Sequence, residues 1–349
     1  MHETTNHDAT TTTDSLLFLR AIRVVLGRTP LWLLTWAVLL LLALLVGFPH
    51  YDWFQSATSH RVEPGSLVHS LTTVFRQDHR ETLGGLEAST ANAGAILLLI
   101  AGLFSVFAAG GWLQVILERT HGQSLRRFFY GGARYFWRFF RFWILTLVVL
   151  AGLHWVLYDW PWNTLVLQFL LDVPKSDFAR LESLASEAGV RWLGFAQAGL
   201  FAIGFVLIVF VWGPLSRTRV ALHDTSSAVW AGLCSAFTIL RHPVKTLRPI
   251  LALLLLELLV VTWIAGGIMR WLDAGLEDSP SRTTIVMMMV VSQLALIWRE
   301  VLRGARYYAA VQVSRELVRP LSRPDPWKSI GGPGGPQYPV GGDEYGVSM

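Results

Sequence analysis

One carboxylate lies within an otherwise unbroken run of apolar residues. The run is LLLLELLVV, from Leu253 to Val261, and the carboxylate belongs to Glu257. A charged side chain in the hydrocarbon of a membrane is costly, and such residues usually pair with a partner or serve a transport or proton pathway. Other polar residues in long apolar runs are Gln114, His154, Gln197, Ser292 and Gln293. Glu257 is therefore the leading candidate for a functional residue.

Glu257 has three interpretations on the sequence alone. In the first it is a neutral carboxyl that hydrogen-bonds to Gln293 or Ser292, since desolvation disfavours the charged form. In the second it forms a structural ion pair with Arg299. In the third it is a proton or substrate site that faces an internal cavity. His154 is a further candidate, either as a base in a lipid-acting enzyme or as a partner of a carbonyl near the membrane interface.

Signatures of enzymes and ligand sites are missing from the sequence. It contains no GxSxG, no HExxH, no phosphate-binding glycine loop and no CxxC pair. Histidines and aspartates between His50 and His79 could ligate a metal, but their spacing matches no familiar ligand pattern, and solvated loop residues are the alternative. We therefore predict no catalytic residue, no metal and no cofactor, and we expect a protein that is not an enzyme.

The elements that must position Glu257 are membrane-spanning helices. Of the 349 residues, 53% are hydrophobic and only 15% are charged, whereas soluble proteins are about 25% charged. Six apolar runs approach or reach the roughly 20 residues needed to cross a bilayer. They are Leu31–Phe48, Ala93–Ile116, Phe142–Tyr158, Trp192–Trp212, Pro249–Met269 and Thr283–Trp298. The predicted fold class is an all-α polytopic membrane protein with six transmembrane helices.

Lys and Arg are distributed unevenly between the two sides of the predicted spans. Most of the 29 Lys and Arg residues fall in the N-terminal segment, in the loops after the second and fourth spans, and in the C-terminal segment. Because loops rich in Lys and Arg stay in the cytoplasm, we expect a multi-pass protein of the cytoplasmic membrane with both termini cytoplasmic. The same charges suit anionic headgroups, so membrane lipids are the predicted partners and nucleic acid is not. The sequence indicates no particular protein partner.

Basic amphipathic segments precede the first, third and fifth spans. They are SLLFLRAIRVVLGRTP, SLRRFFYGGARYFWRFFRF and SSAVWAGLCSAFTILRHPVKTLRP. Aromatic rings with Arg are typical of a helix in the headgroup layer, so we expect three interfacial helices at the cytoplasmic face, the third capped by Asp224 or Ser226. An Arg marks each membrane entry, at Arg28, Arg141 and Arg248, which suggests a threefold repeat of a surface helix plus a transmembrane hairpin.

Small residues recur at every fourth position in two of the spans. The positions are Ala101, Ser105 and Ala109 in span two, and Gly194, Ala198 and Ala202 in span four. Because small residues let helix backbones approach closely, these two spans are expected at the centre of the bundle.

Polar segments flank the six-helix domain, which we assign to residues 15–321. Residues 1–14 are rich in Thr and are predicted to be disordered. Residues 322–349 are dominated by Pro and Gly and are predicted to form a flexible tail without a fold.

The six spans and two of the loop segments resemble a known family. The segments are GGARYFWRFFRF after span two and LSRTRVALHDTSSAVWAGLCSAFTILRHP after span four. The family is the six-helix membrane domain of bacterial glycerophosphodiester phosphodiesterase-type proteins, with its uncharacterised stand-alone relatives. This resemblance, over roughly residues 15–320, implies a bacterial inner membrane and an accessory, lipid-related role. The acidic and histidine residues of the phosphodiesterase domain have no counterpart in this sequence, so no catalytic residue is carried over.

Three functional hypotheses follow from these patterns. The leading one is a non-enzymatic membrane protein that serves as a scaffold, accessory or assembly factor in contact with lipid. The alternative is a transporter or permease in which Glu257 couples to protons or substrate, and the third is a membrane-embedded enzyme that acts on lipid. A water-accessible cavity at Glu257 would favour the transporter, whereas Glu257→Gln should be tolerated if the residue is structural.

Overall fold

The computed structural model describes residues 17–59, 77–118, 123–170, 187–225, 227–278 and 282–317. These residues are almost entirely helical, and none of them lies in a strand. Six helical stretches among them are long and apolar enough to cross a membrane. The prediction of an all-α polytopic protein with six spans is therefore confirmed. The segments predicted to be disordered or flexible, residues 1–14 and 322–349, lie outside the described residues.

The helices include three π-helical segments, η3, η5 and η6, that continue α-helices without a break. The bounds in chain order are α1 (Leu17–Leu26), α2 (Thr29–Thr58), α4 (Arg80–Glu118), α5 (Ser124–Tyr158), α6 (Trp160–Trp162), η3 (Asn163–Leu170), α8 (Glu187–Val206), η5 (Leu207–Trp212), α9 (Gly213–His223), α10 (Ala228–Arg241), α11 (Pro243–Glu257), η6 (Leu258–Ala265), α12 (Gly266–Asp278) and α13 (Arg282–Leu317).

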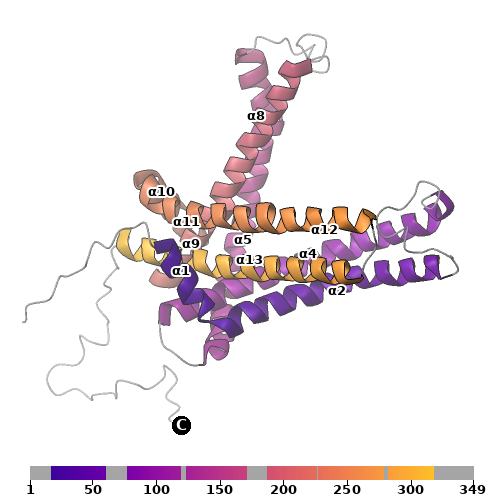
Figure 1. Ribbon diagram of the computed structural model, residues 1–349. Helices are drawn as coiled ribbons and strands as arrows, with labels where there is room; N and C mark the ends of the chain where they lie inside the picture. The colour runs from indigo at the N-terminus through magenta and orange to yellow at the C-terminus, as the bar shows by residue number, and fades with distance from the viewer. Residues whose placement is uncertain are drawn as a thin grey trace, which may run out of the picture.

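Consecutive spans form three hairpins. The first joins α2 to α4, the second joins α5 to α8, and the third joins the α11–η6–α12 stretch to α13. In Figure 1 the α5–α8 hairpin rises away from the other two, and all three diverge from a common end. We call this end the basic end because it holds many of the Lys and Arg residues. It comprises residues 17–28, 106–118, 123–142, 211–225, 227–241 and 299–317. The rest of each hairpin is called an arm.

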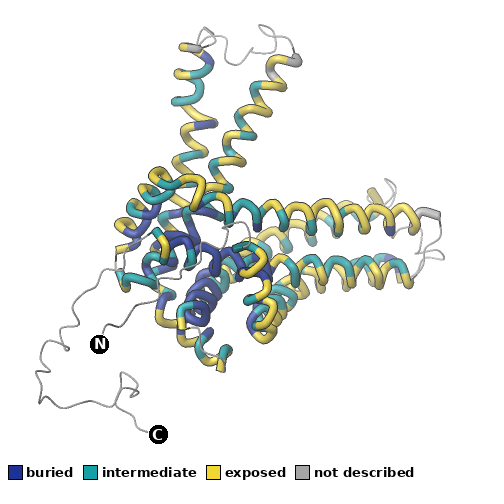
Figure 2. Tube along the Cα trace, turned by 60° about the vertical axis from the view of Figure 1, so that its left-hand side comes forward, coloured by how far each residue is buried: buried dark blue, intermediate teal, exposed yellow. Residues whose placement is uncertain are grey.

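The packed core lies at the basic end. Figure 2 shows buried residues gathered there and exposed residues along the arms. Trp112, Phe128 and Phe139 have no exposed surface, whereas Trp192 and Trp263 in the arms are 73% and 75% exposed. A continuous apolar surface of this kind marks a membrane-contacting face. The interior of the basic end is therefore packed by protein, whereas the arms present most of their apolar side chains outward.

Close packing of α4 against α5 depends on paired glycines. Gly110 of α4 faces Gly131 of α5, and a Cβ added to Gly131 would lie 2.8 Å from the Gly110 carbonyl oxygen and closer still to the Gln114 side chain. Any residue larger than glycine would force these two backbones apart. The first hairpin thus contacts the second where the glycine pair of GGW, residues 110–112, meets the glycine pair of GGA, residues 131–133.

The prediction from small residues is right for span two and wrong for span four. Ala109 of α4 is fully buried. Gly194, Ala198 and Ala202 of α8 are exposed, and a Cβ added to Gly194 would meet no atom within 4 Å. The reason is that α8 lies in an arm that diverges from the other two hairpins, so its small residues face no backbone. Small-residue spacing permits a close approach without requiring one.

Two of the three predicted surface segments are separate helices, and the middle one is not. Arg28 has non-helical backbone angles, and Pro30 lies in the first turn of α2, so α1 ends before the span. His242 and Pro243 separate α10 from α11 in the same way. The middle segment contains no proline, and it continues into the third span as the single 35-residue helix α5. The second unit of the proposed repeat therefore has a transmembrane hairpin but no separate surface helix.

The amphipathic faces of α1 and α10 have different surroundings. In α1, Ala21, Ile22 and Val25 are buried and belong to the main core, which α13 also forms. In α10, Val229 and Leu233 are more than half exposed, in keeping with a helix at a membrane surface. The N-cap of α10 is another correction, because it is neither Asp224 nor Ser226. Ser227 caps the helix through its side-chain oxygen, which accepts a hydrogen bond from the Trp230 backbone N–H at 3.2 Å.

Candidate functional site

Glu257 ends α11 and forms ion pairs with two arginines of α13. One carboxylate oxygen accepts a hydrogen bond from Arg306, and the other lies 3.5 Å from Nε of Arg299. The Glu257 side chain is 16% exposed and that of Arg306 only 8%. Of the three interpretations open on the sequence, this geometry matches the ion pair with Arg299 and adds Arg306 as the more buried partner.

These ion pairs also correct the position expected for Glu257. On the sequence, a hairpin folded at the loop from Arg270 to Arg282 is expected to place Glu257 near the membrane centre, opposite Leu296. The two contacts instead place it between the levels of Arg299 and Arg306. Arg299 lies about 24 Å along the helix from Thr283, at 1.5 Å per residue, and Arg306 lies about 34 Å along it. Because the hydrocarbon core is about 30 Å thick, the cluster lies near its boundary at the basic end.

The other sequence candidates do not join this cluster. The Gln293 side-chain oxygen accepts a hydrogen bond from Trp36 Nε1 at 3.0 Å, which ties the third hairpin to the first. The Ser292 hydroxyl donates to the carbonyl of Met289 in its own helix. His154 stacks on Tyr158 in the α5–α8 arm, with ring centroids 4.8 Å apart. Neither Gln293 nor Ser292 therefore bonds Glu257, and His154 is not in contact with it, as a shared acid–base pair would require.

Four arginines of the basic end line a cavity where the three hairpins diverge. The cavity has a volume of about 660 Å³ and is bounded by α2, α4, α5, α8, η5, α9 and α13. Its polar floor consists of Arg217, Arg299, Arg303, Arg306, Glu300, Tyr307 and Ser105. Its other walls are largely apolar and include Trp36, Leu39, Leu40, Leu147, Leu150 and Phe205. One side of the cavity thus suits an anion, and the other suits hydrocarbon.

Each cavity arginine is held differently. Arg303 lies 3.6 Å from a carboxylate oxygen of Glu300 and donates to both the hydroxyl and the carbonyl of Ser105. Arg306 bonds Glu257, and its guanidinium carbon lies 5.0 Å from the centroid of the Phe210 ring, within cation–π range. Both side chains are therefore fixed by protein groups on α4, α11, α13 and η5.

Arg217 differs from the other three because its bond goes to a neutral group. Its Nη1 donates to the hydroxyl of Tyr307 at 2.9 Å, and its Nε is buried without a hydrogen-bond partner. Within the described part of the chain, Arg217 is in no ion pair with a carboxylate. Arg217 is partly buried, and a cation removed from water without a counter-charge is unfavourable. The floor of the cavity therefore has an excess of positive charge, concentrated at Arg217 and at the 60%-exposed Arg299.

Sequence reasoning found part of this site. Arg299, Arg303 and Arg306 share one helical face with Ser292 and Leu296, and this periodicity was the available signal. Arg217 and Tyr307 were missed as site residues. Arg217 comes just after Gly213 and Pro214 at the end of span four, and on the sequence it belongs to the basic loop. Its place under the cavity follows only from the packing of α9 against α13.

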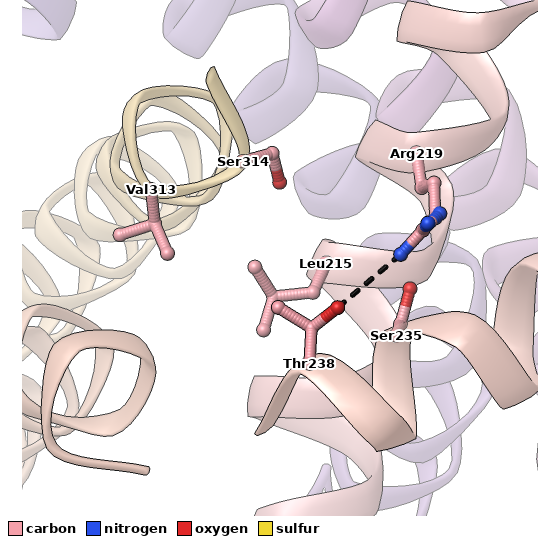
Figure 3. A pocket seen from close by; sticks show the side chains of 6 residues that line it. All are labelled: Leu215, Arg219, Ser235, Thr238, Val313 and Ser314. Atoms are coloured by element: carbon pink, nitrogen blue, oxygen red, sulfur yellow. Dashed lines mark hydrogen bonds between the residues drawn. The ribbon is translucent and has the colours of Figure 1, made fainter. Parts of the chain in front are cut away.

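Two further hollows lie near α10. One is an apolar groove of about 410 Å³ between α10, η5 and α5, whose lining includes Val229, Leu233 and Trp212. The other is shown in Figure 3, where Arg219 donates to the Thr238 hydroxyl at 3.2 Å, Ser235 lies beside the bond, and Ser314 of α13 lies across the hollow. The second has a volume of only about 10 Å³, enough for about one water molecule. The arginine-lined cavity is the one hollow among these three that combines charge with space for a ligand.

No protein-family model, curated protein or solved structure matches this chain. Among the described residues, no group of three or more His, Cys, Asp or Glu side chains lies together as a metal site would need. His60 and His69, which belong to the metal hypothesis for the first outer loop, lie outside those residues.

Proposed function

We propose that this protein is a non-enzymatic, lipid-binding accessory protein of the membrane. The observation that supports this most directly is the arginine-lined cavity, which joins an arginine floor to apolar walls. A membrane lipid has the same division, with an anionic phosphate above hydrocarbon chains. In this proposal Glu257 is structural, because it compensates the charges of Arg306 and Arg299.

A transporter is the second candidate, and the cavity is the observation that favours it. A chamber of about 660 Å³ between three hairpins is large enough for a substrate. However, Glu257 does not line the cavity, and two arginines compensate its charge. The ion pairs with Arg299 and Arg306 therefore favour a structural role for Glu257 over a transport role.

The proposal places the basic end in the cytoplasm of a bacterial cell, with both termini on that side of the inner membrane. The distribution of Lys and Arg supports this orientation. Single cysteines introduced near each terminus, in a Cys234→Ser background, can be labelled with a membrane-impermeant reagent in intact and in permeabilised cells. Labelling only after permeabilisation is expected, and labelling in intact cells would reverse the orientation.

Two measurements on the purified protein test the functional proposal. After extensive washing in detergent, native mass spectrometry should detect phospholipid that stays bound with unchanged mass, since the protein is proposed to bind lipid without transforming it. In proteoliposomes with an imposed pH gradient, wild-type protein and folded Glu257→Gln protein should show the same proton leak. A proton flux that depends on Glu257 would establish the transporter instead. A bound lipid converted to another species would establish an enzyme.

A further inference from the structure

The geometry points to a particular class of ligand for the arginine-lined cavity. We propose that the cavity binds an anionic lipid whose headgroup ends in a phosphate monoester, with the phosphate held by Arg217 and Arg299. This assignment rests on the proposal that the protein binds membrane lipid, and it goes further by naming the headgroup chemistry and the residues.

The charge of the cavity indicates a phosphate rather than a zwitterionic headgroup. Four guanidinium groups line it, and the carboxylates of Glu300 and Glu257 compensate Arg303 and Arg306. Two positive charges remain, on Arg217 and on Arg299, which shares Glu257 with Arg306. A phosphate monoester carries about −1.5 to −2 charges at pH 7. It matches that excess more closely than a phosphodiester, which carries one charge, or a headgroup with no net charge.

The position of Arg217 supports the same ligand. Its Nη1 donates to the hydroxyl of Tyr307, so the guanidinium is held in place on the cavity wall. Arginine binds phosphate oxygens through two parallel N–H groups, a geometry that a held guanidinium presents without further ordering. Arg299 is the most exposed of the ion-paired cavity arginines and is the natural second contact.

The apolar walls distinguish a lipid from free phosphate. Trp36, Leu39 and Leu40 of α2 face the cavity together with Leu147 and Leu150 of α5. Inorganic phosphate would leave this surface without a contact, whereas an acyl chain would cover it. Burial of each CH₂ group contributes about 0.8 kcal/mol, so the walls favour a ligand with a chain.

Binding of defined lipids to the full-length protein in detergent micelles tests the assignment. The probes are phosphatidic acid, phosphatidylglycerol, phosphatidylcholine and inorganic phosphate, with affinity measured by titration and occupancy by native mass spectrometry. We expect the wild type to bind phosphatidic acid at least about tenfold more tightly than phosphatidylcholine, the factor that about 1.4 kcal/mol produces. Phosphatidylglycerol should fall between these two lipids.

Arg217→Gln should remove most of this preference, whereas Arg217→Lys should retain part of it. The matched control is Arg126→Gln, which removes the same charge from an exposed position of α5 outside the cavity. Ala43→Trp provides a second test that leaves every charge in place, because Ala43 is an exposed residue on the apolar side of the cavity. It should weaken the binding of phosphatidic acid, and Ala202→Trp on the exposed face of α8 should not.

The outcomes separate this assignment from the broader function. If wild type and Arg217→Gln bind phosphatidic acid equally, the cavity assignment is overturned while lipid binding stands. If inorganic phosphate binds as tightly as the lipid, the site is one for free phosphate and the lipid assignment fails. If the wild type retains none of the lipids, the proposed function fails with it. Should Arg217→Gln not fold, Ala43→Trp decides, and unchanged binding in that variant overturns the proposal.

Discussion

Large apolar side chains occur both at the basic end and in the arms of this protein, but the two regions differ in how much of these side chains is exposed. Trp112 at the basic end has no exposed surface, while Trp263 in an arm is 75% exposed. A tryptophan side chain is thus surrounded by protein at the basic end and exposed on the surface of an arm. The comparison shows that hydropathy identifies residues that avoid water, but it does not distinguish those covered by protein from those available to lipid.

The largest expected effect compares two tryptophans of these regions. Trp112→Ala should lower the free energy of unfolding by about 3–5 kcal/mol, because it leaves a cavity in a packed core. Trp192→Ala in the α8 arm removes a side chain that is 73% exposed, and its effect should stay within about 0.5 kcal/mol. Reversible unfolding in mixed micelles, followed by circular dichroism, measures both. Equal losses in the two variants would contradict the division into a packed end and outward-facing arms.

The next effect compares two carboxylates. Glu257→Gln leaves the buried Arg306 without its counter-charge and should lower the free energy of unfolding by about 3 kcal/mol. This revises the sequence-based expectation that glutamine would be tolerated, because an amide cannot compensate two arginines. Glu316→Gln is the control, since Glu316 pairs with Lys245 at 3.3 Å where both side chains are 56% exposed. Its loss should be below about 1 kcal/mol.

A double variant checks the cause of that loss. Glu257→Gln combined with Arg306→Gln removes both charges and should recover part of the stability lost in Glu257→Gln alone. Strictly additive losses would show that the ion pair is not the reason for the destabilisation.

Glycine substitutions provide a smaller effect with opposite signs in the two regions. Gly131→Ala should destabilise the protein by about 1–3 kcal/mol, because the added Cβ meets the Gly110 carbonyl and the Gln114 side chain. Gly194→Ala places its Cβ in open space, and it should stabilise α8 by about 0.5–1 kcal/mol through helix propensity. The same unfolding measurement applies, and a stabilising Gly131→Ala would contradict the close contact between α4 and α5.

The smallest effect concerns the surface helix α10. Ser227→Ala removes the oxygen that accepts the Trp230 backbone N–H and should cost about 1 kcal/mol of local stability. Ser227→Gly should lower the local stability by only a few tenths of a kcal/mol, since glycine is itself a favoured N-cap residue. Hydrogen exchange of the first turn of α10 reports the difference. Equal protection in the two variants would show that the cap does not hold the helix.

The six spans could be predicted from the sequence because length and hydropathy decide whether a helix can cross a bilayer. The break before α2 was also readable, since Pro30 follows Gly27 and Arg28. The continuity of α5 could have been inferred from the absence of proline between Ser124 and Phe142. The basic amphipathic composition of that segment instead suggested a separate surface helix.

The site could be predicted only in part. Glu257 and Arg299 are recognisable because charged residues in apolar runs are rare, and the register of a hairpin brings them close. The pairing with Arg306 and the position of Arg217 depend on how α9, α11 and α13 pack at the basic end. One-dimensional periodicity gives the face of each helix but not its neighbour. The same limit explains why Gly194, Ala198 and Ala202 were placed at a helix contact that the fold does not form.

Residues 106–116 of α4 provide the most direct test of the comparison. Hydropathy assigns them to span two, whereas in the fold they are buried in protein at the basic end. In bilayers that contain a lipid with a photoreactive diazirine in its acyl chain, mass spectrometry of the irradiated protein locates the labelled residues. We predict labels in the arms, at residues 41–48, 144–156 and 255–264, and few or none at residues 106–116. Labelling of residues 106–116 as strong as that of the arms would contradict the account.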